Sequence, residues 1–234
     1  MMIQICNDEL TLSIQTLGAQ MMSLKDGKGK EYLWQGDAAT WEDHAPVLFP
    51  FIGRLTQKTY LYQGKAYQMD IHGIAMYSEF EVHKESEQRA VFVLKDSEAT
   101  RKQYPFAFRF QVAYELEGSM VRITYQVQNS GEKEMYFGVG GHPGFCVPFA
   151  GQGAFEDYEI RFDEHARLMR VPISGDGFVL ERETFMPMEN PVYLRHDLFD
   201  NDAIVMSGMG NWAVLTSPMA DKYITVKFPQ MSYL

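Results

Sequence analysis

The sequence predicts an all-β fold, because apolar and polar residues alternate with a period of two along most of the chain. Turn-forming residues, mainly Gly, Asp and Asn, separate the alternating runs. No repeat of fixed length is found, which argues against a propeller or a solenoid. Together, these observations predict an antiparallel β-sandwich or a barrel.

The clearest alternation predicts a long antiparallel hairpin over residues 106–127. A turn at residues 117–119 separates two runs, and each run places its apolar side chains on one face. The first run has the apolar residues Phe106, Phe108, Phe110, Val112, Tyr114 and Leu116. The second run has the apolar residues Val121, Ile123, Tyr125 and Val127.

Shorter alternating runs predict the remaining strands, and one segment, residues 96–106, predicts a short helical turn. Because these runs are brief and closely spaced, we expect several further antiparallel pairs. The runs are residues 10–16, 60–69, 79–96, 157–164, 211–218 and 222–234.

The length of 234 residues predicts one domain spanning residues 1–234, since a single sandwich or barrel can occupy this much chain. Pro and Gly are scattered, so no linker stands out. The last run stays apolar as far as Leu234, whereas domains usually end in frayed polar residues. We therefore expect the domain to lack its C-terminal strands, and we expect an unpaired last strand to favour a homodimer over a monomer.

Composition and charge exclude several kinds of partner. The chain has 21 Lys and Arg against 31 Asp and Glu, giving a net charge of −10 without a basic cluster, so neither nucleic acid nor an anionic membrane is an expected partner. No secretion signal and no run of ~18 apolar residues is found. The two cysteines, Cys6 and Cys146, have no disulfide or metal-ligand spacing. These features predict free, buried thiols and a cytoplasmic protein.

Three short clusters are candidates for chemistry, around Arg54, His72 and His142. Four glycines surround His142, and glycines at this density often mark a close approach of backbone or ligand. An imidazole exchanges protons near neutral pH because its ordinary pKa is about 6.5. With Arg54, the two histidines would form a set of donors suited to a polyhydroxylated ligand or a developing oxyanion. The alternatives are a tight turn at His142, a structural hydrogen bond at His72 and a structural ion pair at Arg54.

Other chemistries find little support in the sequence. A metal-dependent β-barrel enzyme is the main competitor, but no H-x-H or H-x-x-x-H pair is present, so we expect no metal site. Neither a G-x-S-x-G nucleophile motif nor a glycine-rich phosphate loop is found. The other histidines lie among polar residues, and we expect them at the surface: His44, His83, His165 and His196.

The order of the motifs resembles the aldose 1-epimerase-like proteins, in particular the LacX-like branch of the galactose mutarotase fold. The resemblance rests on residues 34–55, on the His-Gly pair followed by A-x-x-S-E-F at residues 72–80, and on GGHPGF at residues 140–145. It covers essentially the whole chain. It implies an all-β fold, a large antiparallel two-sheet β-sandwich known as a supersandwich, and a role in carbohydrate metabolism.

The resemblance also implies a reaction and a role for each site residue. The reaction is interconversion of the α and β anomers of a hexose or a related sugar through ring opening, without a cofactor. His142 is the expected general acid on the ring oxygen, and His72 is expected to bind the sugar and stabilise the transition state. Arg54 is expected to hydrogen-bond sugar hydroxyls. Asp200, and with it Asp202, lies in a segment that resembles a sugar-contacting part of the family.

Two departures from the family pattern favour an alternative. Family members commonly carry HGFAR where this chain has Ile74 and Met76, and the family's catalytic glutamate is expected beyond the position that matches Leu234. A general base typically contributes 10²–10⁴-fold to the rate. The alternative is therefore a catalytically impaired relative that binds sugar, and the identity of the sugar and its phosphorylation are left open.

Overall fold

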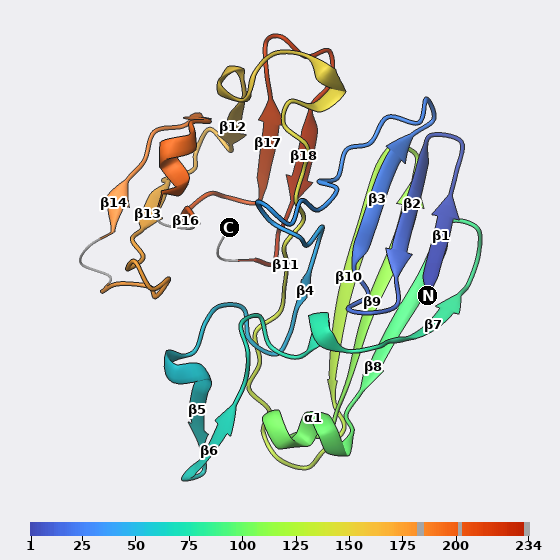
Figure 1. Cartoon of the computed structure of the whole chain (residues 1–234), viewed down its shortest axis with the longest axis vertical. Helices are drawn as coiled ribbons and strands as arrows, with labels where there is room; N and C mark the ends of the chain where they lie inside the picture. Colours follow the sequence, from blue (N-terminus) through green and yellow to red (C-terminus); the bar gives the residue numbers. More distant parts are fainter. Residues whose placement is uncertain (182–184, 201–202, 232–234) are drawn as a thin grey trace. The chain divides into compact units, whose positions relative to one another are not determined.

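The computed structural model describes residues 1–181, 185–200 and 203–231, and they form antiparallel sheets with one short α-helix (Figure 1). The chain is divided into two compact units, residues 1–146 (unit 1) and residues 147–234 (unit 2). Both units are built mainly from strands. The predicted all-β class with antiparallel pairing is confirmed, whereas one domain over residues 1–234 stays a prediction.

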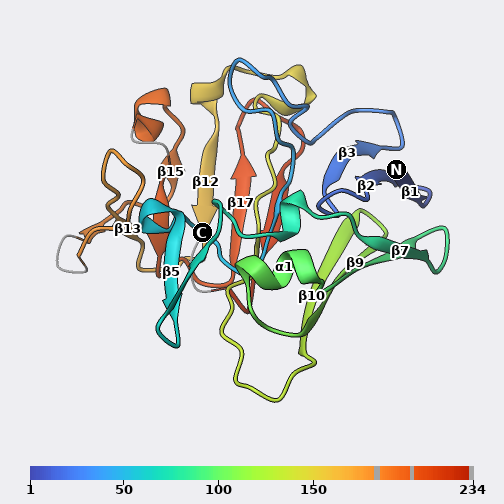
Figure 2. The ribbon, with the colours of Figure 1, turned by 60° about the horizontal axis from the view of Figure 1, so that its bottom comes forward.

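Unit 1 contains two stacked sheets, with strand orders β1-β2-β3 and β10-β9-β8-β7. Figure 2 shows the first sheet lying over the second. The Tyr114 hydroxyl of β9 joins them by donating to the Ala19 carbonyl at 2.7 Å. The strands of the first sheet are β1 (Met2–Cys6), β2 (Leu10–Gln15) and β3 (Met21–Asp26). The strands of the second sheet are β7 (Glu81–Lys84), β8 (Arg89–Lys95), β9 (Phe108–Glu117) and β10 (Met120–Asn129).

Two small strand pairs and three short helices complete unit 1. Helix α1 begins after Ser97, whose hydroxyl accepts from the backbone N–H of Thr100, a capping box that stabilises the first turn. The small pairs are β4 (Val47–Leu48) with β11 (Gly140–Gly141), and β5 (Thr59–Tyr62) with β6 (Lys65–Gln68). The helices are α1 (Glu98–Gln103) and the 3₁₀ turns η1 (Thr56–Lys58) and η2 (Ala75–Tyr77).

The core of unit 1 lies between its two stacked sheets and follows the alternation in the sequence. Every apolar residue predicted on one face of residues 106–116 is buried, and this segment includes all of β9 except Glu117. The return strand, β10, packs its predicted apolar residues against the same core. Phe49, which follows β4, is fully buried, with its ring 4.4 Å from that of Phe110. The core therefore anchors the segment that leads to Arg54.

The described residues of unit 2 form two sheets, with strand orders β15-β12-β17-β18 and β14-β13-β16. A second apolar cluster, which includes Phe162, Met209 and Phe228, forms its core. The first sheet has β12 (Glu159–Phe162), β15 (Val192–Tyr193), β17 (Trp212–Thr216) and β18 (Ile224–Lys227). The second sheet has β13 (Met169–Val171), β14 (Met186–Pro187) and β16 (Val205–Ser207). The 3₁₀ turns are η3 (Phe149–Gly151), η4 (Phe155–Asp157) and η6 (His196–Phe199).

The strand predictions agree with the structure where the alternation is strong. The hairpin predicted over residues 106–127 is formed by β9 and β10, and the helical turn predicted over residues 96–106 contains α1. In the last predicted strand, β18 lies at the edge of its sheet within the described part of the chain, and residues 232–234 lie outside that part. Among the described residues, no helix has the length and apolar character needed to span a membrane.

Replacing Phe49 by Ala tests the role of this residue in the core of unit 1. We expect Phe49→Ala to lower the free energy of unfolding by about 3–5 kcal/mol, because it leaves a cavity among buried aromatic rings. The matched control is Phe51→Ala, which removes an exposed ring two residues later and should cost about 0.5 kcal/mol. Urea unfolding of both variants measures the difference, and equal losses would show that the Phe49 ring is not a core element.

Candidate active site

One segment, residues 46–54, makes main-chain hydrogen bonds to both candidate histidines or to residues beside them. Its strand β4 pairs with β11, and the N–H of His142, which follows β11, donates to the Pro46 carbonyl at 3.0 Å. Phe49 N–H donates to the His72 carbonyl, and His72 N–H donates to the Gly53 carbonyl, both at 3.2 Å. Main-chain hydrogen bonds therefore bring two loops that are 70 residues apart in sequence onto the same short segment.

The backbone of His72 lies in the left-handed region, with a φ of +67°, and Gly73 follows with a φ of +85°. A Cβ at Gly73 would lie 2.3 Å from the Phe49 carbonyl oxygen, so only glycine fits at this position. Ile74 and Ala75 then both donate their N–H groups to that same oxygen, at 2.8 and 3.0 Å. The His-Gly pair is thus a requirement of the turn that presents the His72 ring.

The His72 ring is held by its own hydrogen bond. Nδ1 lies 2.5 Å from the Ile52 carbonyl oxygen, and a carbonyl can only accept, so Nδ1 carries the proton. Burial lowers the pKa of His72, and the charges of His142 and Arg54 lower it further. The Ile52 carbonyl and the Asp43 carboxylate act in the opposite direction. The result is an imidazole biased toward its neutral form.

The His142 ring lies between two other rings. Its centroid is 4.9 Å from that of Trp41 and 5.7 Å from that of His72. Gly144 permits this packing, because a Cβ there would lie 2.7 Å from the Trp41 ring. The glycines around His142 therefore do mark a close approach, and at Gly144 the approaching group is an indole.

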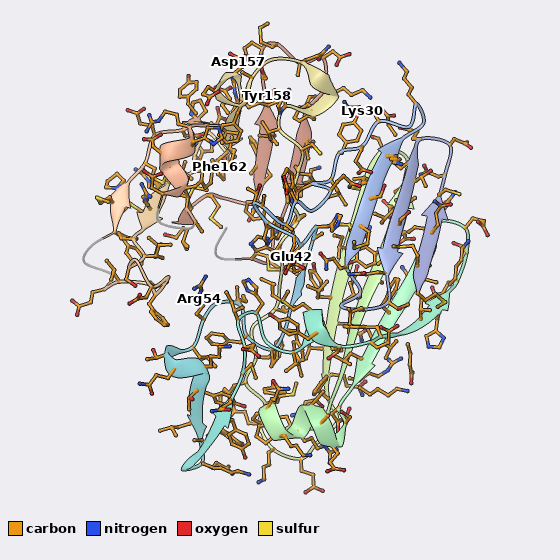
Figure 3. All side chains as sticks on the ribbon, viewed as in Figure 1. Lys30, Glu42, Arg54, Asp157, Tyr158 and Phe162 are labelled. Carbon is orange, nitrogen blue, oxygen red and sulfur yellow. The ribbon has the colours of Figure 1, made fainter. Side chains whose placement is uncertain are left out.

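Arg54 is exposed on the loop between β4 and β5, where Figure 3 labels it. It lies two residues after Ile52, the hydrogen-bond partner of His72, and its charge acts on the His72 ring. The structure thus brings three of the four predicted site residues, Arg54, His72 and His142, together in unit 1. The fourth, Asp200, is exposed after η6 in unit 2, and Asp202 lies outside the described residues.

Sequence reasoning missed two side chains near the histidines, Trp41 and Asp43. Trp41 contacts the His142 ring, and its carbonyl accepts hydrogen bonds from the Trp34 indole at 2.7 Å and from Asp37 N–H at 3.0 Å. Asp43 acts on His72 through its charge. Both belong to an irregular loop before β4, where no periodicity identifies the inward side chains. The only available signal was their position within the family motif at residues 34–55.

One of the predictions for the remaining histidines is wrong. His83, His165 and His196 are exposed as expected, but His44 is half-buried, and its Nδ1 is buried without a hydrogen-bond partner among the described residues. His44 is half-buried because its ring packs closely against Gly36 within the loop of residues 36–44. A Cβ at Gly36 would lie only 2.9 Å from His44 Nε2. Cys6 and Cys146 are free thiols as predicted, but both are half-buried rather than buried.

Other possible sites contain none of the four predicted site residues. Within the described ranges, no cluster of three or more His, Cys, Asp or Glu side chains is arranged to hold a metal ion. A hollow of about 460 Å³ lies beside Leu61 and Tyr136 in unit 1. Another hollow, of about 800 Å³, lies beside Tyr193 and Trp212 in unit 2. The pair of histidines in unit 1 is therefore the candidate site.

Comparison with known proteins identifies the family of the chain. Residues 1–173 match the aldose 1-epimerase family, and this range includes both histidines and Arg54. The chain belongs to that family. It is also 32% identical over 238 residues to the chromosomally encoded protein LacX of Lactococcus lactis subsp. lactis, a match that covers 97% of this chain and 80% of LacX. The plasmid-encoded LacX matches to the same extent.

Two solved structures have the same fold as this family member. A galactose mutarotase related enzyme from Lactobacillus acidophilus is 31% identical to this chain, and the two structures superpose with a TM-score of 0.91. The superposition covers 100% of this chain and 83% of that one. A galactose mutarotase-like protein from Lactobacillus casei is also 31% identical, with a TM-score of 0.86 and coverage of 100% and 81%. The expected galactose mutarotase-like fold is confirmed.

The turn that presents His72 is tested by Gly73→Ala. The new methyl group would meet the Phe49 carbonyl at a positive φ, so we expect a loss of about 1–3 kcal/mol in the free energy of unfolding and a shift of the His72 ring resonances. The matched control is Gly64→Ala, which also has a positive φ but open space within 4 Å, and should leave His72 unchanged. Unfolding curves and proton NMR give the two readouts. An unshifted His72 in Gly73→Ala would contradict this account of the turn.

Proposed function

We propose that this family member interconverts the α and β anomers of a hexose or a related sugar by opening and closing the sugar ring. The observation that carries the proposal is the pair of imidazoles, with ring centroids 5.7 Å apart, in an aldose 1-epimerase family chain. Two imidazoles side by side can transfer protons near neutral pH, as anomer exchange requires. The reaction is proposed to need no cofactor.

In this proposal, His142 is the general acid. Its ring is exposed, so it can donate a proton to the ring oxygen O5 as the C1–O5 bond breaks and the open-chain aldehyde forms. Arg54 hydrogen-bonds sugar hydroxyls, and Asp200 is a further sugar-binding residue. Rotation of the open chain about the C1–C2 bond presents the other face of the aldehyde, and closure on that face gives the opposite anomer.

A second candidate function is sugar binding with impaired catalysis. The observation that favours it is at residues 74 and 76, where the chain has Ile and Met in place of the family's commoner Phe and Arg. Ile74 is only 3% exposed and packs in the core, and Met76 is half-buried. Residue 76 therefore lacks the cationic group that a sugar phosphate would need at this position.

Exchange of the anomers in the presence of the protein tests the proposal. We expect the wild type to accelerate exchange of glucose or galactose above the buffer rate, and His142→Asn to lose roughly 10²–10⁴-fold of that acceleration. The control, His165→Asn, changes an exposed histidine of unit 2 and should retain the full rate. Saturation-transfer NMR of the anomeric protons measures the rates. Binding shifts without acceleration would instead support the second function.

Arg54 is tested separately, because its proposed role is binding. We expect Arg54→Met to raise KM for the sugar about tenfold or more while changing kcat less, since hydrogen bonds from a charged donor are worth about 1.5–3 kcal/mol. Arg167→Met, which alters an arginine in unit 2, is the control. A loss confined to kcat would assign Arg54 to the chemical step instead.

A further inference from the structure

We propose that Trp41 is a positioning residue for the general acid: its indole restrains the imidazole of His142 in the orientation from which it protonates the sugar ring oxygen. The inference rests on the proposed function and deepens it, since it assigns a role at the same site to a residue outside the pair of histidines. Trp41 acts through His142 and transfers no proton itself. The argument depends on what holds the His142 ring and on what holds the indole.

The His142 ring has no hydrogen bond of its own to any of the described residues. Its backbone is fixed, because the N–H of His142 donates to the Pro46 carbonyl at 3.0 Å, but the residue is exposed. His72 differs, because Nδ1 of its ring is held at the Ile52 carbonyl. An exposed imidazole without such a bond can occupy several staggered rotamers. Packing is therefore the interaction that can restrain the His142 ring.

Of the two rings that lie beside His142, Trp41 is the nearer. The indole centroid lies 4.9 Å from that of the imidazole, with an angle of 47° between the ring planes, whereas the His72 centroid lies at 5.7 Å. Ring pairs that are inclined to one another and about 4.5–7 Å apart attract each other beyond the burial of their surfaces. The indole is half-buried and offers a broad apolar surface on one side of the imidazole. Because the ring nitrogens of His142 are unbonded within the described ranges, they are available to a ligand.

The backbone of Trp41 is held on both sides. Its carbonyl accepts hydrogen bonds from the Trp34 indole at 2.7 Å and from Asp37 N–H at 3.0 Å. Shortly after it, the N–H groups of residues 44 and 45 donate to Oε1 of Gln20 at 2.7 and 2.9 Å. Gln20 is only 4% exposed, so this acceptor belongs to the interior of unit 1. The loop that carries the indole is therefore fixed without any contribution from a ligand.

Main-chain hydrogen bonds also set the distance between the indole and the imidazole. Gly144 lies two residues after His142. Its N–H donates to the His44 carbonyl at 2.8 Å, and its carbonyl accepts from Trp34 N–H at 2.9 Å. A Cβ at Gly144 would lie 2.7 Å from the Trp41 ring, so the absence of a side chain lets the two loops come this close. The same set of backbone contacts therefore places both rings.

A general acid depends on such a restraint, because proton transfer requires a short hydrogen bond to the atom that receives the proton. A catalytic group has to be held within about 0.5 Å and 10–20° of its productive geometry. A misplacement of ~1 Å can lower the rate about 10²-fold. Without the indole, the His142 ring would leave its orientation for part of the time. We expect the loss to fall on kcat, because sugar binding is assigned to other residues, among them Arg54.

The first test measures the rotamer of His142 and needs no sugar. In protein labelled with carbon-13 and nitrogen-15, three-bond couplings from Cγ of the ring to the backbone nitrogen and carbonyl carbon report χ1. We expect the values of one staggered rotamer in the wild type, averaged values in Trp41→Leu, and a return to one rotamer in Trp41→Phe, which keeps an aromatic ring. The matched control, Trp212→Leu, alters a half-buried tryptophan of β17 in unit 2 and should leave the couplings unchanged.

The second test measures anomer exchange by the same variants. We expect Trp41→Leu to lower kcat roughly 10–100-fold while KM changes less than about threefold, and Trp41→Phe to recover most of the rate. Trp212→Leu should keep the wild-type kcat. Rescue by an aromatic ring and the separation of kcat from KM distinguish positioning of the acid from a general loss of structure. Unfolding curves check that each variant is folded.

The outcomes separate this inference from the proposed function. A single His142 rotamer in Trp41→Leu would overturn the positioning role, whatever the rates. A rise in KM without a fall in kcat would also overturn it, and would show that the indole contacts the sugar instead. Exchange by Trp41→Leu at the wild-type rate would overturn the inference and leave the proposed function standing. No exchange by the wild type would overturn both.

Discussion

The backbone of residues 46–54 is the constraint on which the candidate site depends. It pairs with the strand before His142, bonds to the main chain on both sides of His72, and fixes the His72 ring through the Ile52 carbonyl. Phe49 anchors the segment in the core of unit 1. The hydrophobic burial of one aromatic ring and a few main-chain hydrogen bonds therefore position groups that are distant in sequence.

The parts of the fold with regular periodicity were predictable from the sequence, and the irregular parts were not. Alternation located the β9–β10 hairpin and its buried face, because a strand exposes and buries successive residues. Arg54, His72 and His142 were recognisable from glycine, histidine and family motifs. The contact of Trp41 with His142 and the burial of His44 arise in a loop closed by individual hydrogen bonds, and no short-range pattern encodes them.

The tautomer of His72 was also beyond sequence reasoning. A histidine in a motif indicates that protons can be exchanged, but the tautomer depends on which acceptor faces Nδ1. Here that acceptor is a backbone carbonyl 20 residues away in sequence, in the segment that contains Arg54. The run of apolar residues around Arg54 therefore serves two purposes, since its side chains anchor the core and its carbonyl groups orient a histidine.

Because main-chain atoms hold both histidine loops, the identity of most nearby side chains is free to change during evolution. The hydrogen bonds of the Phe49, His72 and Gly53 backbone involve main-chain atoms alone, so they do not depend on the side chains at residues 54, 74 and 76. Gly73 is an exception, because a side chain at this position would collide with the Phe49 carbonyl oxygen. A scaffold of this kind allows the surrounding side chains to differ among relatives while the backbone of both histidine loops keeps its hydrogen bonds.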